Sequence, residues 1–138
     1  MSKPTIVCLC GSSRFINHFA VMQWELEKLG AIVLGLHLLP ASYPGPADHI
    51  AEAEGVAKQM DELHLRKIDL ADKITVINVD GYIGDSTKRE IEYARLHGKP
   101  VSWLYTFVCG RCGDNNMHVL EDGLCPNCVR QLTNPEAI

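Results

Sequence analysis

Short apolar runs alternate along this chain with longer segments in which apolar and polar residues are mixed. Apolar runs bounded by turn residues are typical of buried strands, and the longer mixed segments are typical of helices that cover a sheet. We therefore predict strands at residues 5–10, 31–36, 74–79 and 100–105. Helices are predicted at residues 15–29, 56–70 and 86–97.

Strands that alternate with helices indicate a parallel sheet covered on both faces. The sequence thus predicts an α/β fold, a doubly wound sheet of the flavodoxin or Rossmann type with about four to five strands. Residues 37–55 interrupt this alternation and contain Pro40, Pro44, Gly45 and Pro46. That composition predicts a long loop with about one turn of helix, and loops of this length in compact domains are often functional lids.

Length and charge narrow the class of protein. The chain has 138 residues, 46% of them hydrophobic, which suits one compact domain with a small appendage. The formal net charge is −4 and basic residues form no block longer than a pair, so a nucleic-acid partner is not expected, whereas a nucleotide ligand is compatible. No apolar stretch reaches the length of about 18 residues that spans a membrane, and the N-terminus lacks a signal-peptide layout. We expect a cytoplasmic protein without a membrane partner.

The six cysteines form two sets. Cys8 and Cys10 alternate along the first strand and share one of its faces, where free cysteine is commonly buried as a small hydrophobe, so a core role is predicted. The other four form two CxxC pairs, Cys109 with Cys112 and Cys125 with Cys128. Two such pairs predict a zinc ion, and four thiolates leave no open position for water, so this zinc is expected to be structural. Two disulfides fit poorly with the absent secretion signal.

These patterns divide the chain into three predicted parts. Residues 1–106 form the α/β domain, residues 107–132 the zinc ribbon with one zinc per chain, and residues 133–138 a polar tail. A ribbon this short cannot bury enough core to fold alone, so its order should depend on the ion. The chemistry is then expected in the α/β domain, and no organic cofactor is predicted.

A candidate anion site lies where the first strand meets the first helix, in the sequence Gly11-Ser12-Ser13-Arg14. The amides of a helix N-terminus favour an anion, the glycine permits close approach, the hydroxyls donate, and an arginine can bind phosphate in bidentate fashion. The alternative is that Ser12 or Ser13 merely caps the helix, and spacing alone leaves both open. The three glycines of the usual dinucleotide fingerprint are absent, which disfavours NAD.

A second candidate site follows the third strand, where a loop with glycines leads into a helix and contributes Asp80, Asp85 and Glu90. Ligands of open α/β sheets bind beyond the carboxyl ends of strands, so these carboxylates are expected at the mouth of the sheet. Glu90 also fits a capping box with Thr87, in which its side chain bonds back to the start of the helix. The pattern alone favours this capping role, although Asp85 or Ser86 can serve as the cap and leave Glu90 free.

Several of these segments together resemble the nucleoside 2-deoxyribosyltransferase superfamily, in particular a small branch related to deoxynucleoside 5′-monophosphate N-glycosidases. The matching segments are residues 7–15, 69–72, 82–87, 90–94 and 98–100. The resemblance covers residues 5–105 and excludes the ribbon. Residues 37–55, which would include the base-binding segment, show no match, so the base stays open. Glu92 stands where the transferases usually have glycine, on a different side of the helix from Glu90, and is expected to be solvated.

The resemblance implies roles for individual residues. Glu90 would attack the anomeric carbon of a 2-deoxyribosyl group, and an aspartate on the preceding loop, Asp85 with Asp80 as the alternative, would handle the leaving base. The predicted substrate-binding residues are Gly11, Ser12, Ser13, Arg14, Gly84, Ser86 and Tyr93. Tyr93 is a candidate to orient Glu90 from one turn further along the helix. His37 is a candidate to line the pocket, and no role is predicted for His64.

Two classes of function follow. The first is an enzyme that hydrolyses or exchanges the N-glycosidic bond of a 2′-deoxynucleoside 5′-monophosphate, with a small-molecule deoxynucleotide as partner and a homo-oligomeric assembly. A carboxylate can stabilise or trap the oxocarbenium-like state of such a reaction, and a carboxyl held neutral by burial can protonate the departing base. The second is a non-catalytic nucleotide-binding or sensor module whose zinc ribbon docks a partner.

Overall fold

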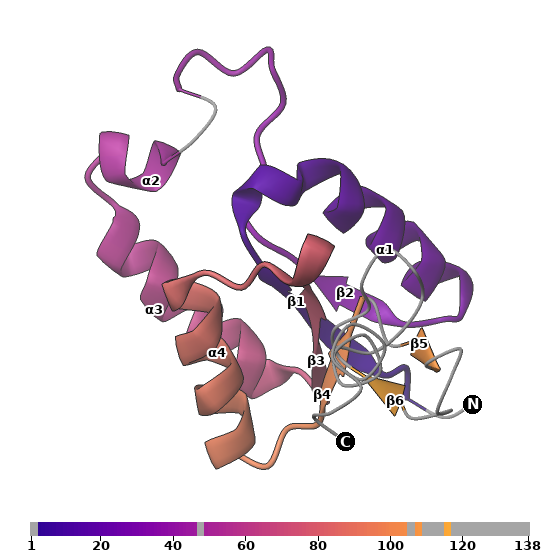
Figure 1. Ribbon diagram of the computed structural model, residues 1–138. Helices are drawn as coiled ribbons and strands as arrows, with labels where there is room; N and C mark the ends of the chain where they lie inside the picture. The colour runs from indigo at the N-terminus through magenta and orange to yellow at the C-terminus, as the bar shows by residue number, and fades with distance from the viewer. Residues whose placement is uncertain (1–2, 47–48, 105–106, 109–114, 117–138) are drawn as a thin grey trace, which may run out of the picture.

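The computed structural model describes residues 3–46, 49–104, 107–108 and 115–116 (Figure 1). Its main sheet has four parallel strands in the order β2-β1-β3-β4. These strands are β1 (Ile6–Gly11), β2 (Ile32–Leu34), β3 (Lys73–Ile77) and β4 (Val101–Trp103). The helices are α1 (Ile16–Lys28), α2 (Ile50–Ala53), α3 (Ala57–Leu70) and α4 (Asp85–Leu96), with 3-10 turns η1 (Ser13–Phe15) and η2 (Val79–Gly81). A separate antiparallel pair joins β5 (Phe107–Val108) to β6 (Asn115–Asn116).

Helices lie on both sides of the main sheet, with α1 on one face and α3 and α4 on the other (Figure 1). The predicted α/β class and the parallel sheet are therefore confirmed, and the arrangement is consistent with a doubly wound fold. Among the described residues, no helix combines the length and the apolar character needed to cross a membrane.

The core is divided by the central strand β1, because successive side chains of a strand point to opposite faces of the sheet. Val7 and Leu9 pack with Phe19 of α1, whereas Cys8 and Cys10 face the side covered by α3 and α4. All four of these β1 side chains are at most 1% exposed. Both faces of β1 are therefore buried, as expected for a parallel sheet.

The element boundaries differ from the prediction mainly at the second strand. The apolar run over residues 31–36 yields only the three-residue β2, which pairs with β1 alone within the main sheet. The expectation that both faces of this strand are covered is wrong at Ile32, which is 47% exposed. In a similar way, the last part of the predicted strand 74–79 becomes the turn η2. The long loop contains one turn of helix, α2, as predicted.

The predicted zinc ribbon falls almost entirely outside the described residues. Its four cysteines, Cys109, Cys112, Cys125 and Cys128, lie outside them, as does the tail at residues 133–138. The structural zinc and the domain boundaries at 106 and 132 therefore stay predictions.

Candidate functional site at the carboxyl end of the sheet

A cleft of about 260 Å³ lies at the carboxyl end of the main sheet. Its lining comes from the segments that follow β1 and β2, from α2, from the start of α3, and from the segment between Tyr82 and Glu90. Figure 1 shows α2 and the loop before it at the end of the sheet where β1 runs into α1. The cleft thus occupies the position in which open α/β sheets bind their ligands.

The cleft brings together most of the residues that the sequence singled out. The predicted residues in its lining are Gly11, Ser12, Ser13, Arg14, His37, Gly84, Asp85, Ser86 and Glu90. Asp80 and Tyr93 do not line it. The two candidate sites, which lie in the first and the last part of the α/β domain, are therefore parts of one cleft.

Gly11 ends β1 in a conformation that a side chain would not permit. Its φ is +155°, and a Cβ atom there would lie 3.0 Å from both the Cβ and the carbonyl oxygen of Ile77 in β3. The absence of a side chain therefore lets β1 and β3 pair closely up to the edge of the cleft. The glycine serves the backbone geometry of the strand end, as well as leaving room beside the cleft.

Ser12 and Arg14 are held by local contacts. The amide of Arg14 donates to Oγ of Ser12 at 3.3 Å, and Nε of Arg14 donates to the same oxygen at 3.2 Å. Ser12 is therefore the N-cap of η1, which confirms the capping interpretation for this serine. The guanidinium of Arg14 lies 4.2 Å from the centre of the Tyr82 ring, across the cleft lining from η1. This stacking fixes the arginine between the two parts of the site.

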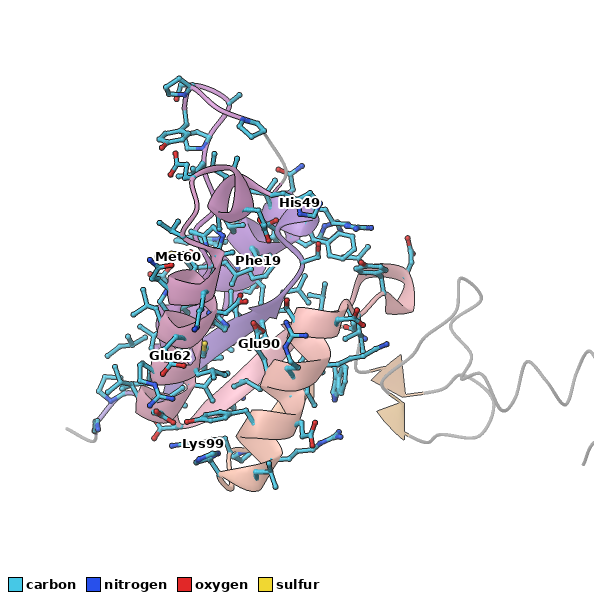
Figure 2. The ribbon with its side chains drawn as sticks, turned by 90° about the vertical axis from the view of Figure 1, so that its left-hand side faces the viewer. Phe19, His49, Met60, Glu62, Glu90 and Lys99 are labelled. Carbon is cyan, nitrogen blue, oxygen red and sulfur yellow. The ribbon has the colours of Figure 1, made fainter. Side chains whose placement is uncertain are left out.

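Glu90 does not cap its helix, so the capping interpretation is wrong. Helix α4 begins at Asp85, Gly84 is its N-cap, and no side chain makes a capping bond. Glu90 therefore lies in the second helical turn, beyond the free amides of the first. Its residue is only 9% exposed, and Figure 2 shows it on the side of α4 that faces α3. The Glu90 carboxyl is therefore part of the lining of the cleft.

The partners of Glu90 come from α3 and β1. Nε2 of His64 lies 3.7 Å from Oε2 of Glu90, and it also lies 3.6 Å from Sγ of Cys8 and 3.4 Å from Sγ of Cys10. All four residues are buried. The ligand atoms of Cys8, Cys10 and His64 lie within 4.8 Å of one another, which is close enough for them to bind a metal ion.

The groups in this cluster perturb one another. Burial raises the pKa of Glu90 to about 7, against the opposing effect of His64. The hydrogen bond with Cys10, supported by His64, lowers the pKa of Cys8 to about 5, while Cys8 and burial raise the pKa of Cys10. Burial on its own would lower the pKa of His64, but Cys8 and Glu90 outweigh it and raise this pKa. The pKa of each group in the cluster therefore depends on the other groups.

His64 is the residue that the sequence analysis missed. It lies one helical turn from Met60 and one from Ile68, so it occupies the buried stripe of α3. The burial predicted for Cys8 and Cys10 is confirmed, but their neighbours include an imidazole and a carboxyl as well as hydrocarbon. A histidine within the apolar stripe of a predicted helix was the available signal, whereas its position opposite Cys8 and Cys10 comes from the packing of α3 on β1.

Tyr93, which was a candidate to orient Glu90, contacts other residues instead. Its hydroxyl donates to Oδ1 of Asp69 at 2.7 Å and accepts from Nη2 of Arg66 at 3.2 Å. It therefore ties α4 to α3 and does not orient Glu90. Tyr93 lines a second hollow, of about 280 Å³, which runs between α3 and α4.

The two candidate aspartates are now distinguishable. Asp80 is exposed within η2, where its φ of +54° places it in the left-handed region, and it does not line the cleft. Asp85 does line the cleft, as the first residue of α4, but it is exposed. Neither candidate aspartate is buried, and the buried carboxyl of the site is Glu90.

No protein-family model and no curated protein matches this chain.

Proposed function

We propose that the protein cleaves the N-glycosidic bond of a 2′-deoxynucleoside 5′-monophosphate, by hydrolysis or by exchange of the base. The observation that carries this proposal is the single cleft that joins the turn Gly11–Arg14 to Glu90. An anion-binding turn and a buried carboxyl at opposite sides of one cleft suit a substrate with a phosphate at one end and a reactive sugar carbon in the middle.

Arg14 is the proposed phosphate ligand. A guanidinium stacked on an aromatic ring presents its N–H groups at its edge, which is the geometry that a phosphate accepts in bidentate fashion. Tyr82 provides that stacking surface, and Ser12 holds the Nε side of the group. Ser86 is the proposed second contact, although its hydroxyl now accepts from Nη2 of Arg89 at 3.1 Å. A bound phosphate would compete with Arg89 for this hydroxyl.

Glu90 is the proposed nucleophile. Its ionised carboxylate forms a bond from one oxygen to C1′ of the sugar while the bond from C1′ to the base nitrogen breaks, and the electron pair of that bond leaves with the base. The base takes up a proton as it departs. Water or a second base then attacks C1′, the bond from C1′ to Glu90 breaks and releases the carboxylate, and the attacking group loses its proton to the acid that protonated the leaving base. Because Glu90 is buried at the floor of the cleft, the ester would be shielded from bulk water until the base leaves.

Asp85 is the proposed partner of the leaving base. It begins α4 five residues before Glu90 and lies in the same cleft. A carboxyl in the lining of the cleft is available to a base nitrogen within hydrogen-bond reach, to which it would pass a proton. This assignment prefers Asp85 over Asp80, which lies off the cleft.

The test is a screen of the full chain against the common 2′-deoxynucleoside 5′-monophosphates and the matching nucleosides, with chromatography of the released free base. Base release from at least one monophosphate, faster than from its nucleoside, is expected. Addition of a second free base then separates exchange from hydrolysis. Glu90→Gln should lower the rate by at least about a thousandfold, because it removes the nucleophile. Glu92→Gln is the matched control, since this exposed glutamate lies on the same helix.

Two results would contradict the proposal. Near-normal turnover by Glu90→Gln would remove the nucleophile from the mechanism. Binding of a deoxynucleotide by calorimetry, with no base released from any substrate, would instead favour the sensor module.

A further inference from the structure

The cluster below the cleft has the spacing of a metal site. With Zn–S bonds of about 2.3 Å and Zn–N bonds of about 2.0–2.1 Å, sulfur and nitrogen ligands of a tetrahedral zinc ion lie roughly 3.5 Å apart. Nε2 of His64 lies 3.6 Å from Sγ of Cys8 and 3.4 Å from Sγ of Cys10. The imidazole nitrogen therefore already stands at the separation from each sulfur that a shared ion would impose, and the two sulfurs lie within 4.8 Å of each other.

Glu90 is the candidate fourth ligand, and its side chain would have to shift toward the sulfurs, because only the ligand atoms of Cys8, Cys10 and His64 lie within 4.8 Å of one another. Its Oε2 lies 3.7 Å from Nε2 of His64, and nitrogen and oxygen ligands of tetrahedral zinc lie roughly 3.4 Å apart. This oxygen is buried and accepts no hydrogen bond from the described residues. A buried carboxylate oxygen without a donor is unusual in a folded protein, and an ion would satisfy it.

We propose that Cys8, Cys10, His64 and Glu90 bind a thiophilic divalent ion, with Zn²⁺ as the first candidate, at a site separate from the predicted zinc ribbon. Two thiolates and an imidazole, with a carboxylate beside them, favour Zn²⁺ over Mg²⁺ or Ca²⁺, which prefer oxygen ligands. The ligands come from β1, α3 and α4, so the ion would join the sheet to both helices on that face.

Metal at this site would also control the cleft. Glu90 cannot attack a sugar carbon while its carboxylate is a metal ligand, so an occupied site is expected to suppress base release. This consequence rests on the proposed function, whereas binding of the ion does not. The same carboxyl would then serve two exclusive roles, ligand in the metal-bound protein and nucleophile in the metal-free protein.

The experiment measures binding without reference to activity. The full chain is stripped of metal and titrated with Co²⁺, whose d–d and thiolate charge-transfer bands report the number of sulfur ligands. The wild type should bind one ion in the ribbon and a second in the cluster. The variant Cys125→Ser/Cys128→Ser removes half of the ribbon ligands and should keep one ion with two sulfur ligands. The variant Cys8→Val/Cys10→Val should keep one ion with four.

Leu9→Val is the matched control, because Leu9 lies between the two cysteines but faces α1. It should keep both ions. Wild-type protein that binds only one ion, with four sulfur ligands, or loss of the second ion in Leu9→Val as well as in Cys8→Val/Cys10→Val, would overturn the site. X-ray absorption of the Zn²⁺-loaded wild type gives an independent readout that needs no variant to fold. A mean of about three sulfur ligands per zinc is expected from one site of each kind, and four would contradict the proposal.

Activity is measured last. If both ions bind and the protein stripped of metal releases no base from any substrate, the metal site stands and the proposed function fails. If base release proceeds equally in the metal-free protein and in protein with the cluster site filled, Glu90 is not a metal ligand, and that part of the proposal is wrong.

Discussion

The two faces of β1 are equally buried and differ in what they bury. On the α1 face, Val7 and Leu9 meet the Phe19 ring, and the buried polar neighbour is the Thr75 hydroxyl, which lies 3.0 Å from Oγ of Ser102. On the other face, Cys8 and Cys10 meet a histidine and a carboxyl at a comparable depth. Burying such groups costs stability unless they are paired or bind a ligand, so burial by itself does not distinguish a core from a site.

This difference indicates that one face of the sheet mainly stabilises the fold and the other mainly provides chemical groups. The α1 face contributes dispersion and hydrophobic stabilisation, and none of the buried titratable side chains of the described residues lies on it. The polar face, which continues into the cleft through Glu90, concentrates groups that are unfavourable in a core and useful in a reaction. The comparison predicts that substitutions on the first face change stability, while substitutions around the cleft change activity or ligand binding.

Phe19→Ala should give the largest effect. Phe19 is 2% exposed in the apolar cluster, so truncation should lower the free energy of unfolding by about 3–5 kcal/mol. Trp24→Ala on the same helix is the control, because Trp24 is 61% exposed and its loss should change that free energy by no more than about 0.5 kcal/mol. Urea denaturation measures both. Equal losses would mean that the α1 face does not provide the core.

Asp85→Asn should lower kcat/KM for base release by about a hundredfold, because the substitution removes a group that can protonate the leaving base. The matched change Asp80→Asn should alter kcat/KM by less than about twofold, since Asp80 does not line the cleft. Steady-state kinetics on the best substrate compares them. A larger loss in Asp80→Asn than in Asp85→Asn would assign the proton donor to Asp80 in η2 and would mean that the substrate binds outside the cleft described above.

Arg14→Ala should weaken binding of a 5′-monophosphate by about tenfold and leave the nucleoside nearly unchanged, because only the phosphate receives the charge-assisted hydrogen bonds. Arg14→Lys keeps the charge but lacks the planar fork, so an intermediate loss is expected. Calorimetry with both ligands gives the answer. Equal losses for the two ligands would remove the turn Gly11–Arg14 from the phosphate role.

The smallest effect is expected from Cys125→Ser/Cys128→Ser. If zinc in the ribbon supports only the ribbon, residues 3–104 should keep the amide hydrogen exchange of the wild type, while one ion per chain is lost. Mass spectrometry of exchanging peptides measures this region by region. Faster exchange in β1 or α4 would show that the ribbon braces the sheet, and the two faces could then no longer be compared in isolation.

The kind and order of the elements are predictable from the local pattern. Apolar runs bounded by turn residues mark the strands, Gly84 and Gly98 flank the helix α4, and alternation with helices requires parallel strands. The carboxyl ends of parallel strands share one edge of a sheet. This rule explains why the turn after β1 and the segment after β3 were expected at one edge, and the structure places both in the cleft.

The contacts across the fold depended on tertiary packing. His64 is 54 residues from Cys10 along the chain, and only the packing of α3 on β1 brings its imidazole to the thiols and to Glu90. The same packing brings the Tyr93 hydroxyl within hydrogen-bond distance of Asp69 and leaves Asp80 outside the cleft. Periodicity states which side of an element is buried, but it carries no information about which side chain of another element lies opposite. That pairing depends on helix positions to within a few ångströms, and these are set by the whole core at once.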